Sequence, residues 1–375
     1  MSGGLSREEQ YWVALNMVAG IGKTLFYRLI NHFHSAEDVF KASNRDLLQV
    51  EGVGKKTAEQ IKDFDSVSRI EREQVLLDRL NAGVLTLNSA RYPKLLKNIY
   101  DPPPVIYYQG AVPDTFPVSI AVVGTRLASS YGKIVTQRLC SQLASLGITL
   151  VSGMARGIDT LVHRTALDNG GTTVAIFGCG LDYTYPPENN KLREEIIGTG
   201  CVLTEFPVST RPDRNNFPAR NRVISGISLG TLVIEAGEKS GALITAEFAL
   251  EQGREVFAVP GNITSEKCRG TNNLIRCGAK MVTSIDSILE ELPDHALDTL
   301  SGKRGDSGIS AESLNDREQK LMSFIGENEI QIDELILKSG LSPAEVSATL
   351  VELELKNLVR QTEGKKFINN QVEIS

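Results

Sequence analysis

The stretch SIAVVGTRLASSYGK, residues 119–133, decides the fold of this chain. Its apolar run 120–123 stops at Gly124-Thr125-Arg126 and a helical pattern follows, an order that predicts a strand, a tight turn and a helix. A parallel strand leading into a helix presents unpaired backbone N–H groups and the positive end of the helix dipole. An anion can bind there, because the turn also supplies a hydroxyl and a guanidinium group. Taken alone, the stretch is better explained as an ordinary turn between a strand and a helix.

Six further apolar runs of strand length follow, and segments of helix length separate most of them. They lie at residues 149–151, 174–177, 202–204, 232–234, 256–259 and 280–282. Short apolar strands between helices predict a parallel sheet covered on both faces, and ligands of such sheets bind outside the carboxyl ends of the strands. Small, hydroxyl or basic residues recur at six strand exits, which favours a ligand site there.

The segment 211–222 carries the strongest local charge. It holds four arginines against Asp213, a net charge of +3 in a chain whose net charge is −6. Phe217 and Asn221 lie between the arginines. Guanidinium groups beside an aromatic ring suit a single nucleic-acid strand, because phosphates meet the cations and an unstacked base meets the ring. The alternative is a solvated basic loop in which Phe217 fills the core.

Acidic residues at other strand exits leave a catalytic interpretation open. Asp159 and His163 are spaced by one helical turn, and Glu205 and Glu235 follow later strands. In the alternative interpretation, Asp159 caps its turn and His163 packs nearby. A dinucleotide fingerprint begins at Gly178 but lacks its third glycine and follows the third predicted strand, which argues against a dehydrogenase.

Length and composition describe an ordinary globular chain of more than one domain. Its 375 residues are 41% hydrophobic and 23% charged. The start shows no signal-peptide pattern, and no apolar run approaches eighteen residues, so we expect neither secretion nor a membrane span. Five cysteines without a CxxC pair and only four histidines predict a cytoplasmic protein with no metal site and no cofactor.

Residues 5–72, before the sheet, have a helical pattern and contain a repeat. GIGK at 20–23 and GVGK at 52–55 each lie between helical stretches, which resembles the helix-hairpin-helix module that grips a phosphate with its hairpin amides. The phosphate-loop interpretation fails, since neither copy has the required earlier glycine. Residues 1–70 hold nine basic and nine acidic side chains, so DNA contact and a structural or protein-contact role both remain open.

Beyond the sheet, the composition of SGKRGDSG at 301–308 predicts a flexible linker. Helical periodicity at 316–326, 332–338 and 342–355, followed by two short apolar runs, resembles a winged helix. Its third helix would be the reader of a major groove. Residues 313–375 have a net charge of −4, however, which favours a protein-contact or regulatory role.

Seven segments together resemble the DNA-processing protein A family, also called DprA or Smf. In chain order they are GTR at 124–126, SGMARGID at 152–159, GCGLDYTYPPEN at 178–189, FPARNRVISGIS at 217–228, EAGEKSGALITA at 235–246, GREVFAVPG at 253–261 and GTNNLIRCGA at 270–279. The resemblance is strong over residues 80–292. It implies an α/β fold with four parts: an N-terminal all-α helix-hairpin-helix (SAM-like) domain at 1–75, an extended Rossmann-like parallel sheet core at 76–295, a linker at 296–312 and a C-terminal winged helix at 313–375.

The same resemblance implies a non-enzymatic protein that binds and protects single-stranded DNA, forms a homodimer and helps to load the RecA recombinase in natural transformation and DNA recombination. It implies no catalytic residue, cofactor or metal. The expected DNA-binding residues are Gly124, Thr125, Arg126, Ser152, Gly153, Arg214, Phe217, Arg220, Asn221, Arg222, Ser240 and Gly241. Many members have serine where this chain has Thr125, a change that keeps the hydroxyl. The alternative function is a Rossmann-like hydrolase of nucleotide N-glycosidic bonds that uses Asp159, Glu205 or Glu235.

Overall fold

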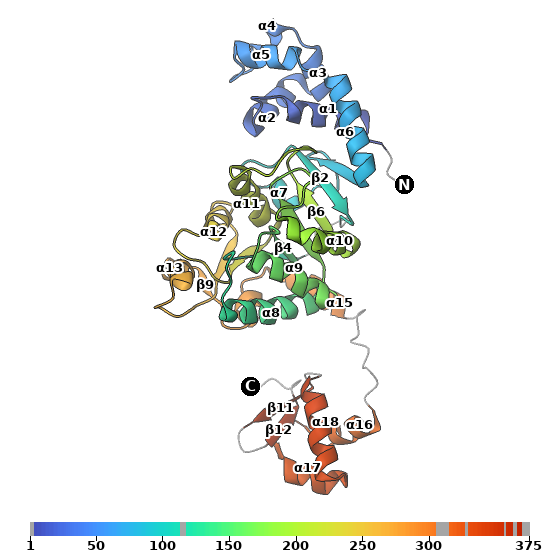
Figure 1. Ribbon diagram of the computed structural model, residues 1–375, viewed down its shortest axis with the longest axis vertical. Coiled ribbons are helices and arrows are strands. Elements are labelled where there is room, and N and C mark those ends of the chain that lie inside the picture. Colours follow the sequence, from blue (N-terminus) through green and yellow to red (C-terminus); the bar gives the residue numbers. More distant parts are fainter. Residues whose placement is uncertain are drawn as a thin grey trace. The chain divides into compact units, whose positions relative to one another are not determined.

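The computed structural model describes residues 4–112, 118–304, 315–326, 329–355, 358–362 and 366–369. The chain divides into two compact units, Met1–Ser301 and Gly302–Ser375 (Figure 1). Each unit has a hydrophobic core of its own, so each is described by itself.

Six helices open the first unit, and they confirm the predicted helical region. They are α1 (Arg7–Met17), α2 (Lys23–Phe33), α3 (Ala36–Lys41), α4 (Asn44–Leu47), α5 (Lys55–Lys62) and α6 (Ser66–Leu80). Gly22 and Gly54 of the two repeats are the N-caps of α2 and α5. Apolar side chains of these helices share a core with Tyr107 and Phe177 of the sheet, so the helices pack directly on the sheet and the boundary at residue 75 stays a prediction.

A nine-stranded sheet forms the centre of the first unit, in the order β1-β2-β6-β5-β4-β3-β7-β8-β9. Its strands are β1 (Ala82–Thr86), β2 (Val105–Gly110), β3 (Ser119–Val123), β4 (Thr149–Ser152), β5 (Thr173–Phe177), β6 (Cys201–Thr204), β7 (Gly230–Val233), β8 (Glu255–Ala258) and β9 (Lys280–Met281). All seven predicted strands are present and pair in parallel, which confirms the Rossmann-like class. The strand order reverses between β3 and β7, and a crevice opens at the carboxyl ends of strands at such a reversal.

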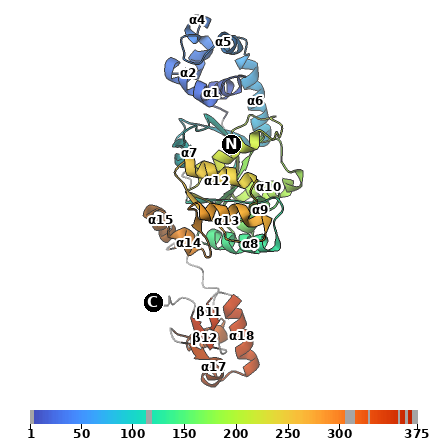
Figure 2. The ribbon, with the colours of Figure 1, turned by 90° about the vertical axis from the view of Figure 1, so that its left-hand side faces the viewer.

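Helices cover both faces of this sheet (Figures 1 and 2). One face carries α8 (Ser130–Ser145), α9 (Ile158–Asp168), α10 (Asn190–Thr199) and α14 (Asp286–Leu289). The other carries α7 (Lys94–Lys97), α11 (Asn216–Ile227), α12 (Gly241–Glu251) and α13 (Arg269–Arg276). Single 3₁₀ turns, Pro187–Asn189 and Glu266–Cys268, precede α10 and α13. Every residue of β3 is buried, because the helices cover it from both sides.

Two strands that the sequence analysis did not predict make the sheet mixed. β1 pairs with β2, and β2 with β6, both antiparallel. The prolines at 102–104 exclude a helix, and the chain becomes strand β2 directly after them. β1 was missed because its five residues follow α6 almost at once and include Gly83, which weakens a strand pattern.

Helix α15 (Asp294–Arg304) corrects part of the predicted linker at 296–312. Leu292, Ala296 and Leu300 are spaced by one turn and buried in the core beneath α8 and α9. This apolar spacing outweighs the glycine- and serine-rich composition that begins at residue 301. Residues 305–312 of the predicted linker lie outside the described residues.

The second unit confirms the predicted winged helix. It contains α16 (Asp316–Met322), β10 (Ile330–Gln331), α17 (Ile332–Ser339), α18 (Pro343–Leu355), β11 (Val359–Thr362) and β12 (Lys366–Asn369). The strands form a small antiparallel sheet in the order β10-β12-β11. Leu321, Leu335, Leu350 and Phe367 join the three helices and the sheet in one core. In neither unit do the described residues form a helix long and apolar enough to cross a membrane.

Candidate nucleic-acid interface

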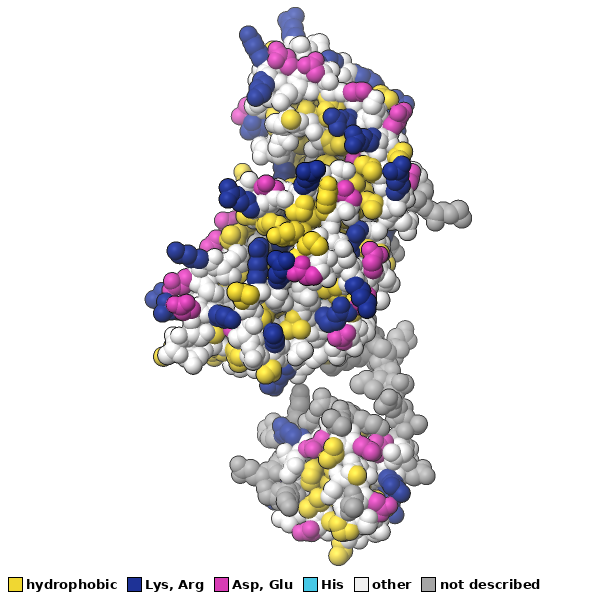
Figure 3. All heavy atoms as spheres, viewed as in Figure 1, with side chains coloured by type: hydrophobic (Ala, Val, Ile, Leu, Met, Phe, Trp, Pro, Cys, Tyr) yellow, Lys and Arg dark blue, Asp and Glu magenta, His cyan; other side chains and the backbone are white. Residues whose placement is uncertain are grey.

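A cleft of about 750 Å³ opens at the carboxyl ends of the strands, where the strand order reverses. The turn after β3 lines it on one side and the turn after β7 on the other, with α11 between them. Figure 3 shows lysine and arginine side chains beside hydrophobic ones in the region where α11 and α12 lie in Figure 1. Nine of the expected DNA-binding residues line the cleft: Gly124, Thr125, Arg126, Arg214, Phe217, Arg220, Asn221, Ser240 and Gly241.

Phe217 lies at the centre of this group. The guanidinium carbon of Arg126 is 5.8 Å from the centre of the Phe217 ring, and that of Arg220 is 5.9 Å from it. The two arginines come from the turn after β3 and from α11, 94 residues apart in the chain, and both lie close to one half-buried ring. Cations on an aromatic ring can hold a phosphate while the ring receives a base.

Arg220 is held in place by the strand exits beneath it. Its Nη1 donates to the backbone carbonyls of Gly153 and Ile176, the latter at 2.7 Å, and its Nε donates to Asn221 Oδ1. A β-carbon on Gly153 would collide with this guanidinium group, so the glycine is required for the close approach. Burial lowers the pKa of Arg220, and the nearby carboxylate of Asp159 opposes that effect. The side chain is therefore a fixed cation rather than a mobile one.

The start of α12 forms the opposite wall of the cleft. Ser240 caps the helix by accepting a hydrogen bond from the Ala242 N–H. Asn221 Nδ2 donates to the Gly241 carbonyl at 3.2 Å, which ties α11 to α12. The N-terminal turn of an eleven-residue helix is thus aimed into a cavity that cationic side chains also line.

The cleft is locally positive in an acidic protein. Arg126, Arg214, Arg220, Lys239 and Lys267 line it together with only two carboxylates, Asp159 and Glu266. The whole chain has a net charge of −6. A cleft with this charge attracts a polyanion through local electrostatics.

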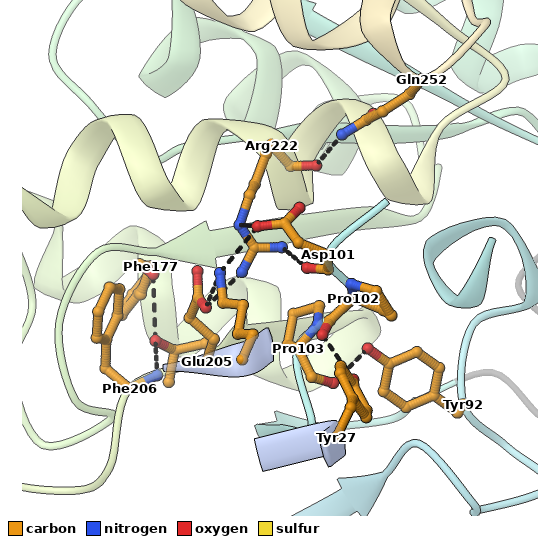
Figure 4. A network of polar contacts seen from close by, with 12 residues as sticks. Tyr27, Tyr92, Asp101, Pro102, Pro103, Phe177, Glu205, Phe206, Arg222 and Gln252 are labelled. Carbon is orange, nitrogen blue, oxygen red and sulfur yellow. Dashed lines mark hydrogen bonds and ion pairs between the residues drawn. The ribbon is translucent and has the colours of Figure 1, made fainter. Parts of the chain in front are cut away.

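Three expected DNA-binding residues do not line the cleft: Ser152, Gly153 and Arg222. Ser152 is fully buried, and its hydroxyl donates to the Val122 carbonyl at 2.7 Å. Arg222 lies on another side of α11, where its Nη2 is 2.5 Å from Glu205 Oε2 and its Nε is 3.4 Å from Asp101 Oδ2 (Figure 4). The side chains of Ser152 and Arg222 are therefore occupied inside the protein. Gly153 borders a narrower hollow beside the cleft, next to Arg220.

The cleft also contains residues outside the expected set, among them Tyr185, Lys239 and Lys267. Lys239 lies in the predicted turn after β7, and the sequence could have indicated it as a binding residue because it is a cation beside small residues. Lys267 lies in the 3₁₀ turn before α13 and donates to the Leu127 carbonyl at 2.7 Å. No sequence pattern connects residue 267 with the β3 exit, since only the folded sheet brings them together.

The candidate catalytic carboxylates all have partners within the protein. Asp159 Oδ2 accepts from the backbone N–H groups of Gly153 and Ala155, and burial raises its pKa. Glu235 accepts from both the N–H and the hydroxyl of Ser129, which fixes the turn before α8. Glu205 pairs with Arg222, as described above.

His163 is enclosed in the core instead of facing the cleft. Its Nδ1 is 2.7 Å from Thr173 Oγ1, and burial lowers its pKa to about 3, so it is neutral at neutral pH. Among the described residues, no three His, Cys, Asp or Glu side chains form a group that could hold a metal.

The first hairpin repeat is attached to the sheet core. Lys23 Nζ lies 3.0 Å from Glu205 Oε2 and 3.5 Å from Asp101 Oδ2, so this lysine belongs to the same buried network as Arg222. Lys55 and Lys56 of the second repeat are exposed at the start of α5. Lys23 of the first copy thus contacts the sheet core, while DNA contact stays a hypothesis for both copies.

Fold and cleft together define a class: an α/β protein with a Rossmann-like sheet, a helix-hairpin-helix region before it and a winged helix after it. Family models match all three parts. "DNA recombination-mediator protein A" matches residues 83–293, "DprA winged helix domain" matches 308–365, and "SAM-like Helix-hairpin-helix tandem" matches 13–64. The chain belongs to the DNA recombination-mediator protein A family, which is the DprA/Smf family.

Relatives from several bacteria agree with this assignment. The chain is 35% identical to Protein Smf of Synechocystis over 96% of this chain and 98% of that protein. It is 40% identical to DNA processing protein DprA of Bacillus subtilis over 64% of this chain and 83% of that protein. The crystal structure of DprA from Streptococcus pneumoniae matches with a TM-score of 0.66 and 31% identity, over 78% of this chain and 99% of that one. A structure of DprA from Helicobacter pylori, described for its single-stranded DNA binding mode, matches with a TM-score of 0.51 and 29% identity, over 56% and 95%.

Proposed function

We propose that the protein binds single-stranded DNA in the cleft between the β3 and β7 exits and does not hydrolyse it. The observation that carries this proposal is the half-buried ring of Phe217 with two guanidinium groups 5.8 Å and 5.9 Å from its centre, in a cleft with five cationic and two acidic side chains. Exposed cations suit the phosphates, and the ring suits an unstacked base of any sequence. The Helicobacter pylori relative, described as binding single-stranded DNA, supports the same function here.

We further propose the wider role that membership of this family supports. In it, the protein protects incoming or recombining single strands in the cytoplasm, forms a homodimer and helps to load RecA during natural transformation and recombination. The family description as a recombination mediator supports this role. RecA filament formation on oligonucleotides coated with a single-strand-binding protein tests it: the protein is expected to shorten the lag, and an unchanged lag would refute RecA loading.

Hydrolysis of nucleotide N-glycosidic bonds is the weaker candidate, because its carboxylates are engaged. Asp159, Glu205 and Glu235 all accept hydrogen bonds or ion pairs from neighbouring protein groups. Incubation with nucleoside monophosphates and chromatography for free base is expected to show no sustained turnover. Release of base in proportion to protein concentration would favour the enzyme.

The binding proposal is tested by fluorescence anisotropy with a labelled oligothymidylate. We expect saturable binding whose logarithmic affinity falls linearly with the logarithm of salt concentration, because the phosphates release counterions when cations replace them. Duplex DNA of the same length is expected to compete poorly, since its bases are not free to stack on Phe217. Absence of binding at low salt would refute the proposal.

A further inference from the structure

Tyr185 forms a second aromatic surface next to Phe217. The centres of the two rings are 5.4 Å apart and their planes are inclined by 32°. The Tyr185 side chain is 38% exposed. It lines both the main cleft and the narrow hollow beside it, where Arg126 and Gly153 are also found. An aromatic ring that is exposed at the border of two cavities is available to a flat ligand.

The segment that carries Tyr185 is fixed before any ligand binds. Asn189, which is buried, donates from Nδ2 to the Met154 carbonyl at 3.0 Å and to Thr160 Oγ1 at 2.9 Å. These bonds attach the 3₁₀ turn to the β4 exit and to α9. The ring therefore loses little conformational entropy when a flat ligand stacks on it.

Phe217 is equally well positioned. Its ring lies against the backbone of Gly178 at the β5 exit, where a β-carbon would come within 2.9 Å of Phe217 Cδ1. Arg126, exposed and at the border of both cavities, is placed to meet a phosphate between the two rings. Two inclined rings with the exposed cation of Arg126 beside them match the repeat of a single nucleic-acid strand: base, phosphate, base.

We infer that Tyr185 is a second base-stacking residue, which receives the nucleotide next to the one on Phe217. This inference rests on the proposed function and deepens it, because it defines the substrate as a strand of at least two consecutive unstacked nucleotides. The strand runs from the start of α12 past Phe217 and leaves over Tyr185. A structural role, in which Tyr185 only packs against Phe217, is the competing explanation.

The test compares Tyr185→Leu with Tyr185→Phe in oligothymidylate binding across a series of salt concentrations. Stacking of one base predicts a loss of roughly 5- to 150-fold for Tyr185→Leu and a salt slope equal to that of the wild type, because no charge is removed. Tyr185→Phe keeps the ring and is expected to bind within about twofold of the wild type. Tyr131→Leu is the matched control, since Tyr131 is 45% exposed but does not line the cleft.

A second variant reports stacking directly and does not depend on removing the ring. Trp12, the single tryptophan of the chain, is buried, so Tyr185→Trp adds an indole whose emission is expected to fall as oligothymidylate saturates the protein. Wild-type affinity in Tyr185→Leu, or unchanged emission in Tyr185→Trp while the DNA binds, would overturn the inference and leave the proposed function standing. If the wild type does not bind oligothymidylate at all, the inference and the proposed function are both refuted.

Discussion

Arg126 shows how one residue acquires a role from the turn in which it lies. It lies in the turn after the buried strand β3, three residues beyond the end of the strand, and its side chain is exposed in the cleft. Among the described residues it has no ion-pair partner within the protein, in contrast with Arg222. Its charge is therefore available to a ligand.

We predict that Arg126→Ala lowers the affinity for oligothymidylate by about tenfold, the cost of one charge-assisted contact. The slope of log affinity against log salt should become smaller by about 0.7, since one phosphate contact on a single strand is lost. Anisotropy titrations at four salt concentrations measure both quantities. Arg138→Ala removes an exposed arginine of α8 outside the cleft and is the control. Equal losses in the two variants would mean that only total charge matters.

Helix α11 carries important side chains on two of its sides. Phe217, Arg220 and Asn221 face the cleft, whereas Arg222 extends to Glu205 and Asp101 (Figure 4). Residues two apart in a helix do not share a face, so this division follows from helical geometry. The buried network anchors the helix that carries the binding side chains.

Arg222→Met is predicted to lower the free energy of unfolding by about 3–5 kcal/mol, because it leaves the Glu205 carboxylate buried with one cation fewer. The double variant Arg222→Met/Glu205→Gln should recover part of that loss. Urea unfolding followed by circular dichroism measures it. Lys280→Met, which breaks an exposed ion pair with Glu291, should cost less than about 1 kcal/mol. If Arg222→Met lowers the free energy of unfolding as little as Lys280→Met does, the network around Arg222 does not stabilise the fold.

Glu73 connects α6 to the loop after β6 and makes stability depend on pH. Its Oε1 accepts from the Val208 N–H at 2.8 Å, and burial raises its pKa to about 7. The folded chain therefore keeps a proton that the unfolded chain releases near pH 4.3. The contribution of Glu73 to the free energy of unfolding is therefore fully present below about pH 4 and is lost as the pH rises to 7.

The corresponding prediction compares the wild type with Glu73→Gln, which cannot ionise. Between pH 5 and pH 8 the wild type should lose stability relative to the variant, by at most about 3 kcal/mol. Urea unfolding at the two pH values measures the difference. Parallel pH profiles for the two proteins would contradict the raised pKa.

Charge is distributed unevenly over the whole molecule. The cleft of the first unit gathers cations, whereas residues 313–375 carry a net charge of −4. The recognition-like helix α18 contains three glutamates and no base within its bounds. The second unit is thus poorly suited to a phosphate backbone.

A chain that ends at Arg304 is therefore predicted to bind oligothymidylate within about twofold of the full-length protein. The first unit includes every cleft residue, and α15 packs on its core through Ala296 and Leu300. Anisotropy on both chains measures this. A tenfold loss on truncation would assign DNA contact to the winged helix.

The sequence predicted the seven parallel strands because each is a short apolar run between helices. It predicted nine cleft residues because the strand exits, the basic segment 211–222 and the family resemblance point to the same edge of the sheet. It could not separate Arg220 from Arg222, since both are arginines and only the rotation along α11 decides which one faces the cleft. The sequence also did not predict that Tyr185 lines the cleft. Its place beside Phe217 depends on bonds from Asn189 to two other elements, which no local pattern records.

The most direct test of the central claim is photocrosslinking of the full-length protein to oligothymidylate that contains 5-iodouracil, followed by mass spectrometry of the linked peptides. Aromatic side chains that stack on the base are expected to crosslink, so peptides with Phe217 should dominate. Crosslinks concentrated on the second hairpin, at residues 52–56, or on α18, with none at the cleft, would contradict the account.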